Sequence, residues 1–197
     1  MNLLFKIGTT EIVLIVVGVL VVILVAWVIS AYNALVRLRN KVRNGWSQID
    51  VQLKRRFDLI PNLAETVRGY AEMEKGIFEE FARARGLYAQ ASRTGNIEGM
   101  AEANNTLAGT LSRLLVVQER YPELKANTNF QEMMKQLRDT EDKISFSRQF
   151  YNDTVLAYND KTELFPTNIV AGMFKFKPAQ FFEVNDEAQR EAPKVKF

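Results

Sequence analysis

The stretch GWSQIDVQLKRRFDLIPNLAE, residues 45–65, decides the fold of this chain. Its large apolar residues recur every three or four positions, which is the period of one face of an α-helix. These residues are Trp46, Ile49, Leu53, Phe57, Ile60 and Leu63. A proline lies inside the run, and three cations stand just ahead of it. We therefore predict a long amphipathic helix. Two questions follow: whether the helix continues past the proline, and which segments cover its apolar face.

Pro61 permits two structures. Asp58 could cap a new helix that has Pro61 in its first turn, where the missing N–H group costs little. Alternatively, one helix continues with a kink, because the hydrogen bond from Pro61 to Phe57 is lost. The apolar stripe keeps its phase from Phe57 to Val67. The sequence therefore favours a continuous helix with a kink at Pro61.

The apolar stripe extends well beyond this stretch. Apolar residues at helical spacing run from Tyr32 to Tyr88, which predicts one continuous or nearly continuous helix. The loop composition of SRTGN, residues 92–96, ends it. This helix is too long for shorter partners to cover, so we expect part of its stripe to be exposed and available for self-association.

Two further helices are predicted after this loop. One runs from about Ile97 to Tyr121, where Pro122 ends or kinks it. The other begins at a capping box of Thr128 and Gln131 and stops at LFPTN, residues 164–168. No strand pattern competes. The predicted fold is all-α: an N-terminal transmembrane helix, then an elongated antiparallel helical bundle of three long helices with a C-terminal aromatic strap.

The transmembrane helix is predicted from residues 12–29, IVLIVVGVLVVILVAWVI, which contain no charged or polar side chain. Eighteen residues at a rise of 1.5 Å span about 27 Å, close to the ~30 Å hydrocarbon core of a bilayer. The anchor extends from Ile12 to Ile29, with Trp27 and Tyr32 at the interface. A cleaved signal peptide would have a shorter apolar region after a basic stretch, and a buried soluble helix is usually shorter, so we favour a retained anchor.

Basic residues gather on one side of this anchor. Only Lys6 lies upstream, whereas a juxtamembrane basic collar follows downstream, made of Arg37, Arg39, Lys41 and Arg43. The positive-inside rule then places the N-terminus outside and the body in the cytoplasm. The predicted organisation is a short extracytoplasmic N-terminus (1–11), a transmembrane helix (12–31), a cytoplasmic helical-bundle domain (32–187) and a polar C-terminal tail (188–197).

The composition argues against most catalytic chemistry. The 197 residues include no Cys and no His, which removes thiolates, the commonest general base and the commonest metal ligand. A net charge of +3 does not indicate a nucleic-acid-binding domain. Neither a Gly-rich phosphate loop nor a Gly-x-Ser-x-Gly elbow is present. We expect no enzymatic activity, no catalytic residues, no cofactor or metal, and no nucleic-acid partner.

Charged residues offer one candidate interaction surface. Arg55 and Arg56, next to Asp58, form either a solvated face with local ion pairs or a site for an acidic partner; the solvated face is favoured. The acidic residues Asp139, Glu141 and Asp142 lack the Gly-containing pattern of a calcium loop and are interpreted as solvated helix surface.

An aromatic segment offers the other candidate surface. The sequence GMFKFKPAQFFEV, residues 172–184, carries Phe174, Phe176, Phe181 and Phe182. Burial of each Phe is worth roughly 1.5–3 kcal/mol, so the segment needs a partner. We expect a strap that folds back over the bundle. Docking into a neighbouring subunit is the second alternative and contact with the membrane surface is the third.

Two long segments resemble the LemA family. They are YNALVRLRNKVRNGWSQIDVQLKRRFDLIPNLAETVRGYAEMEKG (32–76) and LFPTNIVAGMFKFKPAQFFEV (164–184). The resemblance covers nearly the whole chain and implies a single-pass protein of the bacterial cytoplasmic membrane with an all-α cytoplasmic body. It implies no activity and no site residues. Met73 stands where many relatives have His, which argues against a required histidine.

Two functions follow as expectations. The first is a membrane-anchored, non-enzymatic scaffold that forms a homo-oligomer through its long apolar-striped helix and its aromatic C-terminal segment. The second is a signalling or adaptor module that recruits another protein to the lipid bilayer. The oligomeric mass of the solubilised protein separates self-assembly from a monomer, and co-purification of a second protein favours the adaptor.

Overall fold

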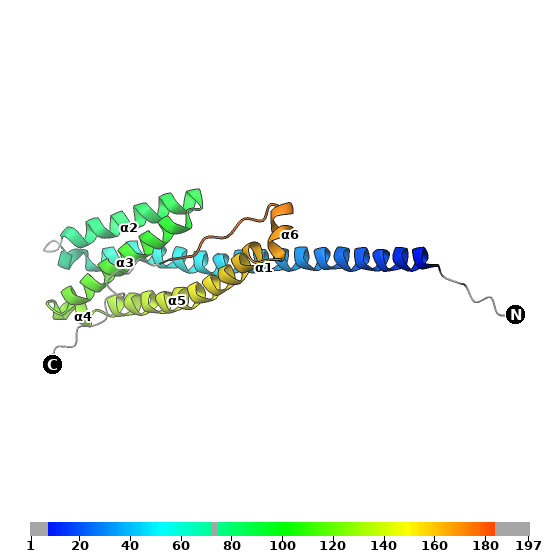
Figure 1. Cartoon of the computed structure of the whole chain (residues 1–197). Helices are drawn as coiled ribbons and strands as arrows, with labels where there is room; N and C mark the ends of the chain where they lie inside the picture. Colours follow the sequence, from blue (N-terminus) through cyan, green and yellow to red (C-terminus); the bar gives the residue numbers. More distant parts are fainter. Residues whose placement is uncertain (1–7, 72–74, 184–197) are drawn as a thin grey trace, which may run out of the picture. The chain divides into compact units, whose positions relative to one another are not determined.

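The computed structural model describes residues 8–71 and 75–183, most of which are helical. The helices are α1 (Thr9–Ala71), α2 (Lys75–Thr94), α3 (Ile97–Gln118), α4 (Pro122–Ala126), α5 (Thr128–Glu163) and α6 (Thr167–Met173) (Figure 1). No strand occurs in these residues, which confirms the all-α fold class.

The chain divides into two compact units. The first contains the residues up to Val42 together with Leu156–Ala179. The second contains Arg43–Val155 and the residues from Gln180 onward. Both α1 and α5 contribute to each unit.

Helix α1 continues without interruption through Pro61. This excludes a new helix at Asp58 and confirms a continuous helix, in which the carbonyl of Phe57 lacks its usual N–H donor. Phe57 and Leu63 are both buried, so the apolar face keeps its direction across the proline. The bend at Pro61 stays a prediction.

The prediction of one helix as far as Tyr88 is wrong. Helix α1 ends at Ala71, and α2 folds back along it, so that the rings of Phe57 and Tyr88 stack with centroids 4.2 Å apart. Both helices turn their apolar faces to the same core, so the helical spacing of apolar residues persists through the reversal. Periodicity therefore could not reveal it, and the bundle has four long helices instead of three.

The ends of the next helices follow local chemistry. Gly95 adopts the left-handed region with φ of 67°, which ends α2 at the predicted loop. Asn96 then caps α3 by accepting a hydrogen bond from the Gly99 N–H at 3.1 Å. Helix α3 ends before Pro122, as predicted, and this proline begins α4.

The predicted cap of α5 is wrong by one residue. Asn127, not Thr128, has an extended backbone, and its Oδ1 accepts a hydrogen bond from the Phe130 N–H at 3.1 Å. The Gln131 side chain donates instead to the Lys125 carbonyl at 2.7 Å. Asn is as good an N-cap as Thr, so composition alone could not choose between neighbours.

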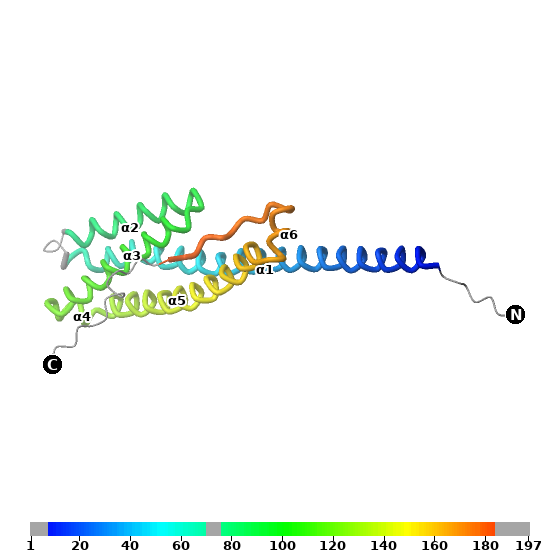
Figure 2. Tube along the Cα trace, viewed as in Figure 1, coloured from blue at the N-terminus to red at the C-terminus, as the bar shows by residue number. Residues whose placement is uncertain are grey.

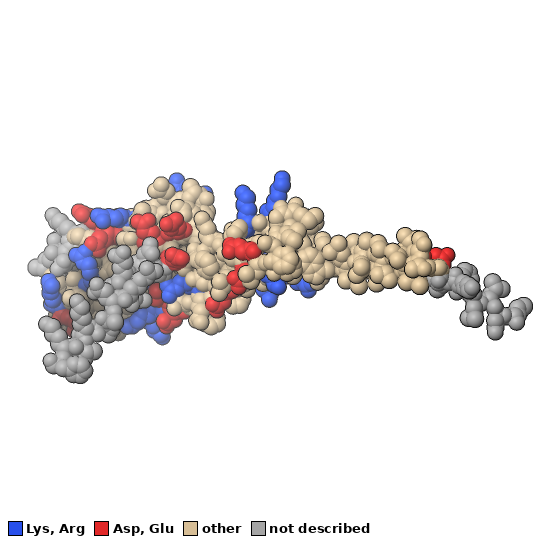
Figure 3. Space-filling model, in the orientation of Figure 1, with Lys and Arg blue, Asp and Glu red and all other residues tan. Residues whose placement is uncertain are grey.

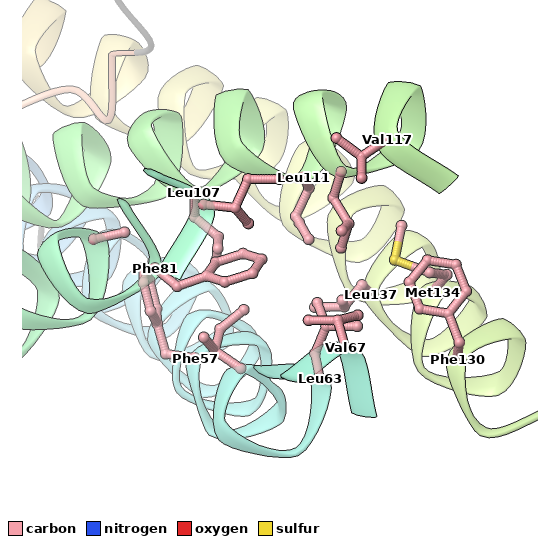
Figure 4. Close-up of a cluster of buried hydrophobic side chains, with 14 of the residues drawn as sticks. Phe57, Leu63, Val67, Phe81, Leu107, Leu111, Val117, Phe130, Met134 and Leu137 are labelled. Carbon is pink, nitrogen blue, oxygen red and sulfur yellow. The ribbon is translucent and has the colours of Figure 1, made fainter. Parts of the chain in front are cut away.

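The core of the second unit lies between α1, α2, α3 and α5, with Leu124 of α4 at its end. Figure 4 shows side chains from all four long helices meeting. Those labelled are Phe57, Leu63, Val67, Phe81, Leu107, Leu111, Val117, Phe130, Met134 and Leu137. The apolar stripe of α1 is thus buried by other helices of the same chain. The expectation that part of it stays exposed for self-association is wrong.

Helices α1 and α5 run antiparallel in the second unit. The rings of Trp46 on α1 and Tyr151 on α5 lie 5.8 Å apart. Arg56, ten residues after Trp46, pairs with Glu141, which lies ten residues before Tyr151. The two backbones are close at Gly45, where a Cβ would lie 3.4 Å from the Cα of Tyr151, an ordinary van der Waals contact.

In the first unit, α5 ends at Glu163, just before LFPTN as predicted, and is followed by the unpredicted helix α6. Val170 and Ala171 form its buried face. Lys175 has φ of 56°, and the Phe176 N–H donates to the Ala171 carbonyl at 2.9 Å, which closes the helix. Seven residues are too few for a periodic signal. Figure 2 shows the extended segment that follows α6.

Candidate interaction surfaces

In the second unit, α5 holds the end of the C-terminal segment. The Tyr151 hydroxyl donates to the Gln180 carbonyl at 2.7 Å. Asn152 bonds both backbone groups of Phe182, accepting from its N–H at 2.9 Å and donating to its carbonyl at 3.2 Å. Phe182 is fully buried, 5.8 Å from the Trp46 ring. Burial also raises the pKa of Tyr151 to about 12.

The first unit repeats this arrangement. The Tyr158 hydroxyl donates to the Lys177 carbonyl at 3.0 Å. Asn159 accepts from the Ala179 N–H at 2.8 Å and donates to its carbonyl at 3.0 Å. The predicted strap, which we define as residues 174–183, is therefore confirmed, and its backbone is fixed by side chains of α5.

These α5 residues were missed by sequence reasoning, although the sequence carries a signal for them. Tyr-Asn-Asp occurs at 151–153 and again at 158–160, a spacing of seven residues or two helical turns. Each Tyr bonds one strap carbonyl, and each Asn bonds both polar groups of one residue. The repeat could have indicated an extended segment lying along α5.

The strap also contacts α1 in the first unit. The Tyr32 ring lies 4.7 Å from the ring of Phe174 and 5.7 Å from that of Phe176. The Arg39 guanidinium stands 5.0 Å above the Phe176 ring, within the range of a cation–π interaction. Tyr32 and Arg39 thus pack against the strap.

Phe181 is the most outward-facing aromatic residue in the second unit's part of the strap. With acidic neighbours it lines a shallow cavity of about 470 Å³. The lining residues are Glu98, Glu102, Asn105, Thr106, Gln180, Phe181 and Glu183. Within the described ranges, 8–71 and 75–183, no group of three carboxylates comes together as a metal site.

Arg56 lies inside the second unit and not on its surface. Only 3% of it is exposed, Nη1 donates to Asn104 Oδ1 at 2.5 Å, and the same guanidinium pairs with Glu141. Burial lowers the pKa of Arg56, which the Glu141 carboxylate partly opposes. The interpretation of Arg56 as part of a solvated face is wrong, because helix packing buries it beside Glu141. The side chain of Glu141 is itself 43% exposed, and Arg55 is exposed.

An open groove lies between α1 and α5 in the second unit. It measures about 610 Å³. Ser47, Gln48, Val51 and Gln52 line it from α1, and Asp142, Lys143, Phe146 and Ser147 line it from α5. Phe146 is 74% exposed and Val51 61% exposed. These eight residues, called the α1–α5 groove below, were not predicted, because they lie outside the main apolar stripe.

One helix in the described part of the chain is long and apolar enough to cross a membrane. Its residues 12–26 are exposed along their whole length. Trp27 and Tyr32, the predicted interface residues, are half-buried. Figure 3 shows this part of α1 free of charged side chains beyond the acidic residue at its start. Of the collar, Arg37, Lys41 and Arg43 are exposed, and the guanidinium of Arg39 lies on Phe176.

Fold and surfaces define an all-α bundle protein with one long apolar N-terminal helix. A model of the LemA family matches residues 45–197, so the chain belongs to the LemA family. The predicted resemblance is confirmed. Met73, where the sequence differs from many relatives, lies outside the described residues.

Curated relatives agree with this family. The chain is 27% identical over 186 residues to "Magnetosome protein MamQ 2" of Paramagnetospirillum magneticum, covering 83% of this chain and 68% of the relative. "Magnetosome protein MamQ" of Magnetospirillum gryphiswaldense is 25% identical, with 77% and 64% covered. "Protein LemA" of Metamycoplasma hominis is 24% identical, with 78% and 69% covered.

Proposed function

We propose that this protein is a membrane-anchored, non-enzymatic scaffold whose bundle associates with a second copy of itself through the α1–α5 groove. The observation that carries the proposal is that Val51 and Phe146 both line that groove and are both well exposed. Apolar surface gathered in this way on a small domain usually marks an interaction site. Phe150, one helical turn beyond Phe146, is also exposed and extends the apolar surface.

The charges of the groove favour a second copy as the occupant. Asp142 and Lys143 are neighbours in the groove, with opposite charge. In a two-fold association, residue i of one copy meets residue j of the other, and j meets i. Asp142 of each copy can then face Lys143 of the other copy, which gives two ion pairs, so the charges of the groove are complementary to those of a second groove.

Membrane attachment rests on the apolar part of α1. Residues 12–29 match the thickness of a bilayer, and the collar follows on one side only. We infer a single-pass protein of the bacterial cytoplasmic membrane with the bundle in the cytoplasm. The absence of His and Cys from the whole chain supports a non-enzymatic role. The curated relatives named for the magnetosome are compatible with a role at a membrane, and no activity is carried over from them.

The self-association is tested with a matched pair of substitutions. Val51 and Val116 are exposed to almost the same extent, 61% and 62%, on α1 and α3. Val51→Asp places charges in the groove of each copy and is expected to reduce the oligomer to a monomer. Val116→Asp should leave the mass unchanged. The measurement is light scattering of the full chain in detergent over a wide concentration range.

A charge swap tests the proposed two-fold pairing. Lys143→Asp alone should weaken association, because it sets Asp against Asp, whereas the double swap of Asp142→Lys with Lys143→Asp should restore it. A wild-type protein that stays monomeric would reject self-association and leave the adaptor role. If Val51→Asp and Val116→Asp lower the oligomeric mass equally, the groove is not the surface through which two copies associate.

A further inference from the structure

The turn between α5 and α6, within the first unit, carries an unusual amount of exposed apolar side chain. Phe165 is 79% exposed, the highest value for a large apolar side chain among the residues described. Four neighbours in the same short stretch are also exposed. We define the α5–α6 corner as Leu164, Phe165, Ile169, Met173 and Phe174.

The corner has a defined outward face. Val170 and Ala171 are buried, whereas Ile169 and Met173, four residues apart on α6, are exposed on the same side of the helix. Phe174 continues that surface, with its ring also in contact with Tyr32. Five large side chains within eleven residues are thus presented away from the unit's own core.

The position of the corner along α1 identifies what it faces. Phe174 contacts Tyr32, which is three residues, or about 4.5 Å of helix, beyond Ile29 at the end of the apolar run. The interfacial layer of a bilayer extends roughly 5–8 Å beyond the hydrocarbon core on each side. The corner therefore lies at the depth of that layer when residues 12–29 cross the core.

The direction of α6 agrees with this depth. Figure 1 shows α6 running across the axis of α1 instead of along it. When α1 crosses the membrane, α6 lies close to the membrane plane, as an interfacial amphipathic helix does. The strap then leads away from the apolar run, because Phe176 contacts both Tyr32 and Arg39.

Cationic side chains border the corner. Lys161, Lys175 and Lys177 are all exposed. Lys175 occupies a left-handed position that glycine usually takes at a helix end, so a charged side chain stands where a residue without a Cβ fits better. Lysines of this kind reach phosphate headgroups while the apolar residues beside them lie deeper.

We propose that the α5–α6 corner is a second membrane-contact site, which inserts into the headgroup region of the same bilayer that α1 crosses and takes phospholipid as its ligand. The proposal rests on the proposed anchoring of α1. Its effect is to hold the start of the strap, and the end of α5, against the membrane surface.

The chain has no cysteine, so single-cysteine variants of the full protein carry one fluorescent label each. The variants are Leu20→Cys in the anchor, Phe165→Cys and Ile169→Cys in the corner, and Leu156→Cys on α5. Leu156 is the matched control, because its exposure of 54% is close to that of Ile169, 53%, within the same unit. Each labelled protein is reconstituted in vesicles of phosphatidylcholine and phosphatidylglycerol with lipids spin-labelled near the headgroup or deep in the chain.

If the proposal is correct, the labels in the corner are quenched by the spin label near the headgroup. The label at position 20 is quenched by the spin label deep in the chain, and the label at position 156 is quenched by iodide in the aqueous phase. Corner labels quenched by iodide as fully as Leu156, with Leu20 still in lipid, would overturn the corner and leave the anchor intact. Corner labels shielded from both quenchers would reject lipid and indicate a protein contact. Quenching of Leu20 by iodide would reject the anchor itself.

Discussion

At the scale of single residues, the least expected feature is a charged side chain inside the bundle. Arg56 was expected in solvent, yet α1, α3 and α5 enclose it with Asn104 and Glu141. A buried guanidinium needs its counter-charge, because an unpaired charge in the interior costs several kcal/mol. Arg56 Nε has no hydrogen-bond partner among the described residues, so the guanidinium depends on the bonds made by Nη1.

Removal of the counter-charge should therefore destabilise the bundle. We expect Glu141→Gln to lower the free energy of unfolding by about 1–3 kcal/mol, less than for a fully buried pair because Glu141 is partly exposed. Denaturant titration of the full chain in detergent, followed by circular dichroism, measures this. Glu65→Gln is the control, since its pair with Arg68 is exposed and worth ~0–1 kcal/mol. In an Arg56→Met background Glu141→Gln should cost little, and an undiminished cost there would contradict the pairing.

Tyr151 predicts a loss of stability at alkaline pH. Its pKa is raised to about 12 in the folded state from 10 in the unfolded state, so both states keep the proton below pH 10. Between pH 10 and 12 only the unfolded state releases it, and stability falls by about 2–3 kcal/mol. Unfolding titrations at pH 9 and 11.5 should show a smaller fall for Tyr151→Phe. The fall that remains includes Tyr88, whose pKa is also raised by burial. An identical fall in both proteins would contradict this assignment.

At the scale of elements, the strap shows how a non-helical segment is held on a helical bundle. It has no backbone ladder of its own, so side chains of α5 satisfy its peptide groups. Asn152 and Asn159 serve this purpose in the second and first unit respectively. The apolar residues of the strap predicted that it needs cover, whereas the direction of its path depends on polar groups spaced along another helix.

Loss of one asparagine should release one end of the strap. Asn152→Ala removes two hydrogen bonds to Phe182, each worth a net ~0.5–1.5 kcal/mol, so we expect a cost of about 1–3 kcal/mol. Release of Phe182 should also change the fluorescence of Trp46, measured in a Trp27→Phe background. Asn62→Ala, at an exposed position of α1, is the control and should alter neither property. Unchanged Trp46 fluorescence in Asn152→Ala would show that the asparagine does not hold the strap.

Helix ends were predicted well where a single residue type enforces them. Gly95 ends α2 in a left-handed conformation, and Pro122 begins α4 shortly after α3 has ended at Gln118. Pro61 did not end α1, since a helix supported by packing on either side tolerates one missing hydrogen bond. The reversal after Ala71 was missed because it leaves the apolar spacing intact.

At the scale of the whole molecule, topology decides how the described surfaces can be used. With residues 12–29 in the bilayer, the collar and the bundle share one side of the membrane. A bundle in the cytoplasm can meet only cytoplasmic surfaces or a second copy in the same membrane. The association that we propose through the α1–α5 groove would then join two copies within that membrane.

Orientation can be measured with a membrane-impermeant maleimide. Ser92→Cys, exposed on α2, should stay unlabelled in intact bacterial cells and react after the membrane is permeabilised. Thr9→Cys, at the start of α1, should react in intact cells. The native chain, which has no cysteine, is the control for background. Labelling of Ser92→Cys from outside would reverse the proposed orientation.

The sequence alone determined the helical class, the apolar run at residues 12–29, the collar and the family resemblance. These features depend on composition and on the spacing of residues within a few helical turns, so they can be recognised from residues that are close in the sequence. Tertiary structure decided that α2 folds back on α1, that Arg56 is buried, and that the groove and the α5–α6 corner remain exposed. Each of these depends on contacts between residues that are far apart in the sequence, for example Tyr32 with Phe174. Helical periodicity does not indicate which residues of different helices make contact.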